Sequence, residues 1–238
     1  MQIKLKQDQD IYVKPKWKIW PGFLILFISF VIGVIPFLFQ NSVQRPSGFL
    51  ILLNVLQFAC FFLIPLYVAG VLYKQPLQAL GIQARFLTRG VGKALQWGFM
   101  LWLLNVLAAI ILQVIFPNQP QDMQMLMQAM LEESNAFELG GLIFCVTVLA
   151  PIGEEIFFRA FLFGALEARF GTLVGIIISA AVFGILHETI WNFFPLFVGG
   201  CGFALLYAKY RDISMNIVAH ATWNSISVIL MLTMLKGS

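Results

Sequence analysis

The sequence predicts an all-α fold, a polytopic bundle of about seven membrane helices with an active site inside the bundle. Of the 238 residues, 60% are hydrophobic and only 11% are charged, whereas a soluble domain carries about 25% charged residues. Several apolar runs approach or exceed the roughly 20 residues that a helix needs to cross a bilayer. These runs are continuous and do not alternate as strands do, and lipid leaves no backbone group to be satisfied by water, so we expect helices.

The apolar runs define the expected elements and their division along the chain. The seven expected helices span residues 19–39, 48–73, 93–116, 137–169, 172–187, 191–210 and 213–235. Residues 119–135 are expected to form a short interfacial helix or loop. We therefore divide one membrane protein into a cytoplasmic tail (1–18), an N-terminal part with three helices and the outer interfacial segment (19–136), and a catalytic core with the last four helices (137–238).

The basic residues predict the orientation of the chain. They group in four places that the helix pattern puts on one side of the membrane: Lys4, Lys6, Lys14, Lys16 and Lys18; Lys74, Arg85, Arg89 and Lys93; Arg159 and Arg169; Lys209 and Arg211. Only Arg45 and Lys236 remain for the other side. Short cytoplasmic loops are enriched in Lys and Arg, so we expect the N-terminus in the cytoplasm and the C-terminus outside.

The same distribution bears on location and partners. Positive charges spread over short loops indicate a lipid bilayer as partner and no nucleic acid. The compact chain predicts a prokaryotic plasma membrane or an organellar membrane. The long polar N-terminus, with no small-residue cleavage site after the first apolar run, does not fit a signal peptide.

Three charges stand inside the fourth expected helix, in the stretch GEEIFFRAF (153–161). One charge at the centre of a membrane helix costs about 2.5–3.5 kcal/mol. Glu155 and Arg159 are four residues apart and share a helix face, so we expect them to pair. Whether this pair supports a site or only fixes helix packing is left open. Glu154 lies about 100° around the helix and needs a partner from elsewhere.

The two histidines of the chain are the expected partners. Glu154 and His187 each lie about 16 residues, or roughly 24 Å, from the turn that joins helices four and five, so an antiparallel hairpin brings them to one depth. His220 and Asn224 share a face of the last helix, roughly 13–19 Å from the turn before it. A glutamate beside imidazoles can activate water, and further donors can hold an oxyanion. For Asn224 an interhelical hydrogen bond is the alternative.

Pro151 and Gly153 precede these charges. A proline leaves the carbonyl four residues earlier without its helical donor, so we expect the helix to kink or loosen there. The alternative is that the proline has no special role, since prolines are common in membrane helices.

These residues, in this order and spacing, resemble the three motifs of the CPBP family, the CAAX proteases and bacteriocin-processing enzymes also called the Abi family, to which the Rce-type prenyl-protein endopeptidases belong. The motifs are Glu154-Glu155-x-x-x-Arg159, Phe183-x-x-x-His187 and His220-x-x-x-Asn224, and the resemblance covers about residues 140–230. It implies an intramembrane endopeptidase that cleaves a membrane-associated or lipidated protein or peptide, with a CAAX-like or leader-type substrate.

The resemblance also implies roles for the site residues. Glu154 activates the attacking water together with His187, and His220 and Asn224 support the oxyanion. Glu155 and Arg159 support the site. Such enzymes have been described first as metalloproteases and then as metal-free glutamate proteases. We expect no cofactor, and the alternative is Zn²⁺ held by Glu154, His187 and His220 with a water in the fourth position.

Other intramembrane proteases fit less well. After His187-Glu188, a zinc protease of the HExxH type needs a histidine where Trp191 stands, and the four aspartates of the chain lie outside the apolar runs. No serine near the site helices has the usual glycine-flanked motif. The second hypothesis is a catalytically silent membrane scaffold or a proton-coupled transporter, since buried carboxylates and histidines also build proton relays. A transporter would be favoured by inverted repeats, which the sequence does not show.

Overall fold

The computed structural model describes residues 13–38, 47–83, 90–118, 135–187 and 190–237, and these ranges contain helices and no strand. The predicted all-α fold is thus confirmed. The helices are α2 (Trp20–Leu38), α3 (Ser47–Tyr67) continued by the π-helix η1 (Val68–Leu72), the short 3-10 helix η2 (Leu77–Leu80), α5 (Val91–Ile115), α10 (Thr172–Ile185), α11 (Ile190–Tyr210) and α12 (Ile213–Gly237). The expected interfacial segment at 119–135 lies outside the described residues except for Asn135, as do the loops with Arg45, Arg85 and Arg89.

The predicted fourth helix is one continuous rod of 35 residues, Ala136–Phe170. It changes its helical type along its length. Its parts are α7 (Ala136–Phe144), the π-helix η3 (Cys145–Leu149), α8 (Ala150–Glu154), the π-helix η4 (Glu155–Phe163) and α9 (Gly164–Phe170). It begins with a capping box in which Asn135 and Glu138 satisfy each other's backbone N–H groups.

Within the described residues, five helices are long and apolar enough to cross a membrane, and this makes the chain an integral membrane protein. They lie within α3–η1, α5, the Ala136–Phe170 rod, α11 and α12. The apolar stretches Trp20–Val34 and Thr172–Ile185 are shorter. At 1.5 Å per residue, the 14 residues of α10 reach about 21 Å, less than the roughly 30 Å of a hydrocarbon core. The predicted count of seven crossings is therefore approximate, and the orientation of the termini remains a prediction.

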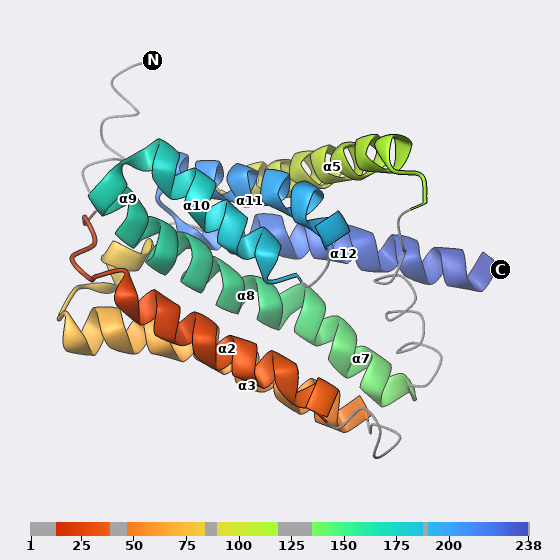
Figure 1. The fold of residues 1–238 in the computed structure, drawn as a ribbon, viewed down its shortest axis with the longest axis horizontal. Coiled ribbons are helices and arrows are strands. Elements are labelled where there is room, and N and C mark those ends of the chain that lie inside the picture. The colour runs from red at the N-terminus through yellow and green to blue at the C-terminus, as the bar shows by residue number, and fades with distance from the viewer. Residues whose placement is uncertain (1–12, 39–46, 84–89, 119–134, 188–189, 238) are drawn as a thin grey trace.

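The Ala136–Phe170 rod is the centre of the bundle. It lies between the antiparallel pair α2–α3 on one side and α5, α10, α11 and α12 on the other (Figure 1). Every residue of η4 is buried. The ring of Phe157 stacks on Phe61 of α3 at 4.8 Å, and the ring of Phe158 meets Phe183 of α10 edge-on at 5.1 Å. Aromatic contacts thus fix the middle of the rod against helices on both sides.

Small residues let the helices of the second group approach closely. A Cβ atom built on Gly199 of α11 would lie 2.4 Å from the Trp223 ring, and one on Gly202 would lie 2.2 Å from Leu101. The tightest contact with backbone is at Gly98 of α5, where a Cβ would lie 2.3 Å from the carbonyl oxygen of Ala219. Small residues at such crossings are what close membrane-helix packing requires.

Gly98→Ala is expected to destabilise the protein, because the added methyl meets the backbone of α12, which cannot move aside as a flexible side chain can. Overpacking of this kind typically costs about 1–3 kcal/mol. Gly92→Ala, in the same helix, is the matched control, since a Cβ there meets nothing within 4 Å. Thermal unfolding in detergent should show a lower midpoint for Gly98→Ala alone. Equal midpoints for the two variants would contradict this packing.

Candidate active site

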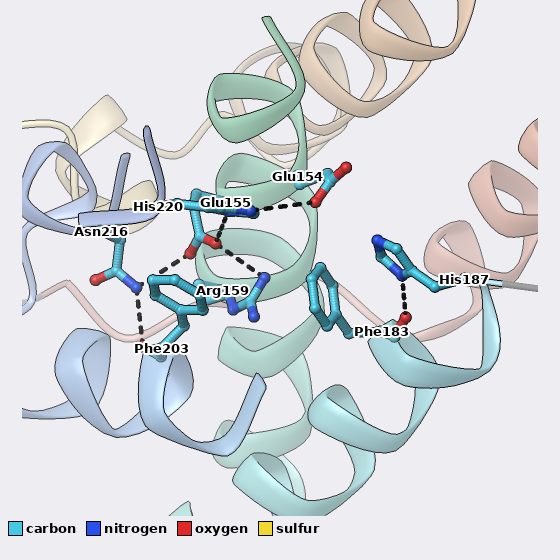
Figure 2. Close-up of polar contacts among 8 residues, drawn as sticks. All are labelled: Glu154, Glu155, Arg159, Phe183, His187, Phe203, Asn216 and His220. Atoms are coloured by element: carbon cyan, nitrogen blue, oxygen red, sulfur yellow. Dashed lines mark hydrogen bonds and ion pairs between the residues drawn. The ribbon is translucent and has the colours of Figure 1, made fainter. Parts of the chain in front are cut away.

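The carboxylate of Glu155 is the most enclosed charge of the site, with 0% of the side chain exposed. Its Oε1 atom lies 3.0 Å from Nη1 of Arg159 and 2.8 Å from Nδ1 of His220. Its Oε2 atom accepts a hydrogen bond of 3.1 Å from the Asn216 side chain. Figure 2 shows these contacts converging from η4 and α12. The expected ion pair between Glu155 and Arg159 is therefore present, within a larger network.

Arg159 is enclosed by aromatic rings. Its guanidinium carbon lies 4.5 Å from the ring centre of Phe183 on α10 and 5.1 Å from that of Phe203 on α11. Neither Nη atom makes a well-aligned hydrogen bond to the described residues, so the contact with Glu155 is an ion pair only. Ring faces attract a desolvated cation. The guanidinium thus holds η4, α10 and α11 together.

His220 joins the two adjacent glutamates. Its Nδ1 atom contacts Glu155, and its Nε2 atom lies 3.9 Å from Oε2 of Glu154. An ionised carboxylate only accepts hydrogen bonds, so the Nδ1 atom must carry the proton. Phe203 stacks on the imidazole at 4.8 Å and keeps the ring in this orientation. The remaining nitrogen, Nε2, therefore faces Glu154.

Glu154 faces both His220 and a pocket. Its side chain is 18% exposed, and it lines a pocket of about 70 Å³ between α3 and the rod. A cavity needs roughly 10–15 Å³ to hold one water, so this pocket has room for the water that hydrolysis consumes. With a neutral His220, the two glutamates and Arg159 leave the cluster with one net negative charge.

His187 lies at the end of α10. Its Nδ1 atom is 2.8 Å from the carbonyl oxygen of Phe183, which can only accept, so Nδ1 carries a proton and Nε2 remains for other contacts. The His187 ring lies 4.6 Å from the ring of Phe183, which in turn lies 6.2 Å from the ring of His220, so Phe183 stands between the two histidines. In Figure 2, the other ring nitrogen of His187, which has no dashed line, is turned toward Glu154. Within the described part of the chain, no hydrogen bond or ion pair joins these two side chains.

Asn224 contacts the rod itself, donating from its side-chain amide to the carbonyl oxygen of Val146 at 2.8 Å. That carbonyl is deprived of both helical donors. The N–H of Ala150 bonds Cys145 in the π-helical pattern, and Pro151 has no N–H to offer. The loosening expected at Pro151 thus takes the form of η3, and the interhelical hydrogen bond considered for Asn224 is present. Its role in holding an oxyanion remains a prediction.

Asn216 belongs to the site although the sequence analysis did not select it. It donates to Glu155 and to the carbonyl oxygen of Phe203, the latter at 2.8 Å. Its spacing offered a signal, because Asn216, His220 and Asn224 follow one another at intervals of four residues on one face of α12. His220 and Asn224 of that row were predicted as site residues from the sequence.

The positions of the donor atoms bear on the zinc alternative. Among the residues that the structure describes, no three His, Cys, Asp or Glu side chains are grouped closely enough to hold a metal ion. Glu154, His187 and His220 therefore do not fit a zinc site as arranged here, and no catalytic step is assigned to a metal. That the protein works without a cofactor remains a prediction.

The last part of the chain is similar to known proteins. Residues 137–226 match a family model described as type II CAAX prenyl endopeptidase Rce1-like. The chain is 35% identical over 105 residues to a protein of Bacillus subtilis named "Putative membrane peptidase YdiL", and this match covers 44% of the chain and 42% of that protein. It is 34% identical over 91 residues to an uncharacterized protein of Mycoplasma capricolum, covering 37% of the chain and 26% of that protein.

The chain thus spans less than half the length of these curated relatives. No solved structure matches it. The resemblance to this family is confirmed for the part of the chain that the family model matches, residues 137–226.

Glu155→Gln is expected to destabilise the protein by about 3–5 kcal/mol, because it leaves the buried Arg159 cation unpaired. Glu154→Gln is the matched control, since its partly exposed side chain lies 3.9 Å from His220 and carries no buried ion pair. Thermal unfolding of both variants in the same detergent gives the comparison. A Glu155→Gln midpoint as high as that of Glu154→Gln would show that the ion pair does not hold the bundle together.

Proposed function

We propose that the protein is an intramembrane endopeptidase in which Glu154 activates a water to hydrolyse a peptide bond of a membrane-associated protein or peptide. The observation that carries the proposal is the position of the Glu154 carboxylate, which borders a water-sized pocket and lies 3.9 Å from Nε2 of His220. The match of residues 137–226 to a family model described as CAAX prenyl endopeptidase supports hydrolysis over transport or a silent scaffold.

In the proposed reaction, Glu154 takes up one proton and later delivers it to the leaving group. Glu154 accepts a proton from water while the water oxygen bonds to the scissile carbonyl carbon, and negative charge moves to the carbonyl oxygen. The protonated Glu154 then delivers this proton to the departing amine nitrogen as the carbon–nitrogen bond breaks. No co-reactant other than water is consumed.

The histidines and Asn224 are assigned supporting roles. His187 helps Glu154 to activate the water, and its Nε2 atom is available because Nδ1 is committed to Phe183. His220 and Asn224 support the oxyanion. Because Nδ1 of His220 is held by Glu155, this ring can donate to an oxyanion only from Nε2, and only while Nε2 carries a proton. Donors fixed in advance by a buried network need little reorganisation when charge develops.

The proposed substrate is a membrane-associated or lipidated polypeptide of the CAAX-like or leader type. The proposed location is a prokaryotic plasma membrane or an organellar membrane, with the N-terminus in the cytoplasm. The apolar helices of the described part of the chain that can cross a bilayer fit a substrate that is itself held at the membrane.

Glu154→Gln is expected to abolish cleavage without unfolding the protein, because the amide cannot accept the proton from water. The test compares the peptide termini of all membrane proteins in cells that make the native protein or the variant at matched levels. A new terminus that appears only with the native protein identifies the cleaved bond.

Glu138→Gln is the control for a Glu-to-Gln change in the same rod, since glutamine also completes a capping box at this position. It should give the native termini. Termini that persist in the Glu154→Gln membranes would contradict the proposed mechanism. A complete absence of termini specific to the native protein would favour a scaffold or a transporter.

A further inference from the structure

The pocket beside Glu154 has a second wall that comes from outside the family match. Its lining on the rod is formed by Cys145, Leu149, Ala150, Gly153 and Glu154, and its lining on α3 by Asn54, Gln57, Phe58 and Phe61. The α3 helix precedes the family match, which begins at residue 137. The sequence analysis assigned no site role to its two amides, which lie one helical turn apart.

The pocket lies along the rod and reaches Glu154. Ile51 of α3 packs at the level of Gly141, and Phe58 packs at the level of Gly153. The two helices therefore run in the same direction, and the lining of the pocket on the rod runs from Cys145 to Glu154. Asn54 is exposed, whereas Gln57 and Glu154 are half-buried. The exposed amide thus marks the outer end of a path that ends at the reactive carboxylate.

The chemistry of this path suits a peptide backbone. No hydrogen bond within the described ranges uses the Gln57 side chain, and an amide in an apolar environment needs a partner. A substrate segment must unwind around its scissile bond, and in lipid its freed N–H and C=O groups need partners too. A side-chain amide offers both a donor and an acceptor, as a peptide group does.

The size of the pocket argues against a lipid in it. Sites for larger organic ligands enclose about 300–1,000 Å³, whereas this pocket measures about 70 Å³. At this size the pocket can take the peptide group beside the scissile bond, while the rest of the extended segment and a lipid attached to the substrate would remain outside it.

From these observations we infer that Asn54 and Gln57 are positioning residues for the substrate. They hydrogen-bond the backbone of an extended segment beside the scissile bond and bring its carbonyl to Glu154. The inference rests on the proposed endopeptidase function. It makes α3 part of the substrate site, although α3 lies outside the family-matched residues.

The test uses a peptide of about 20 residues that spans the cleaved bond read from the new terminus and is reconstituted with the purified protein in lipid vesicles. Gln57→Leu should raise KM about tenfold with little change in kcat, because a lost hydrogen bond is worth about 1–1.5 kcal/mol. Asn54→Leu should act in the same direction. Gln57→Asn, which keeps an amide, should recover part of the loss.

Two controls separate substrate binding from helix packing. Asn105→Leu makes the same amide-to-leucine change on α5, away from the pocket, and should leave KM unchanged. Gln57→Leu should also unfold at the native temperature. Unchanged KM in Gln57→Leu and Asn54→Leu, or a loss of activity that only follows a lower unfolding temperature, would overturn the inference while leaving the proposed function standing. Absence of any terminus specific to the native protein would overturn both.

Discussion

The buried carboxylate of Glu155 is the interaction on which the centre of this bundle depends. A charge with no exposed surface is tolerated only when it is paired and hydrogen-bonded, and Glu155 receives Arg159 from its own helix and His220 and Asn216 from α12. Arg159 in turn requires the rings on α10 and α11. The need to satisfy one carboxylate thus sets the relative positions of four helical segments, and the other polar residues of the site take their places from it.

Two neighbouring glutamates have different environments because successive residues of a helix point in different directions. Glu155 points into the ion network, whereas Glu154 reaches the pocket and the second nitrogen of His220. The imidazole of His220 lies between them. Glu155 fixes the orientation of the ring, and Glu154 faces its Nε2 atom. Glu155 therefore stabilises the bundle, the adjacent Glu154 carries the proposed chemistry, and His220 contacts both.

The sequence alone was sufficient for features that depend on one segment, and less so for those that depend on lateral packing. Apolar runs predicted the helices to within one or two residues at most ends, and the spacing of four predicted the Glu155–Arg159 pair. The role of Asn216 was not predicted, because nothing in its own segment indicates that η4 lies opposite. The π-helices were not predicted, because their hydrogen-bond pattern depends on the whole rod. Pro151 predicted some loosening of the helix, but not that the Asn224 side chain would donate to the carbonyl oxygen of Val146. The pocket wall on α3 escaped because helix neighbours cannot be read from hydropathy.

The most direct test of this account is the protonation of the His220 ring, because the orientation of its Nε2 atom toward Glu154 follows from a proton on Nδ1. The chain has two histidines, so protein labelled with ¹⁵N-histidine in detergent micelles gives one pair of ring-nitrogen signals for each imidazole, and His187→Gln assigns the two pairs. The account predicts a proton on Nδ1 of His220, whether the ring is neutral or charged, and a change in this signal in Glu155→Gln. A bare Nδ1 with the proton on Nε2 would contradict it, since the ring would then not be held by Glu155.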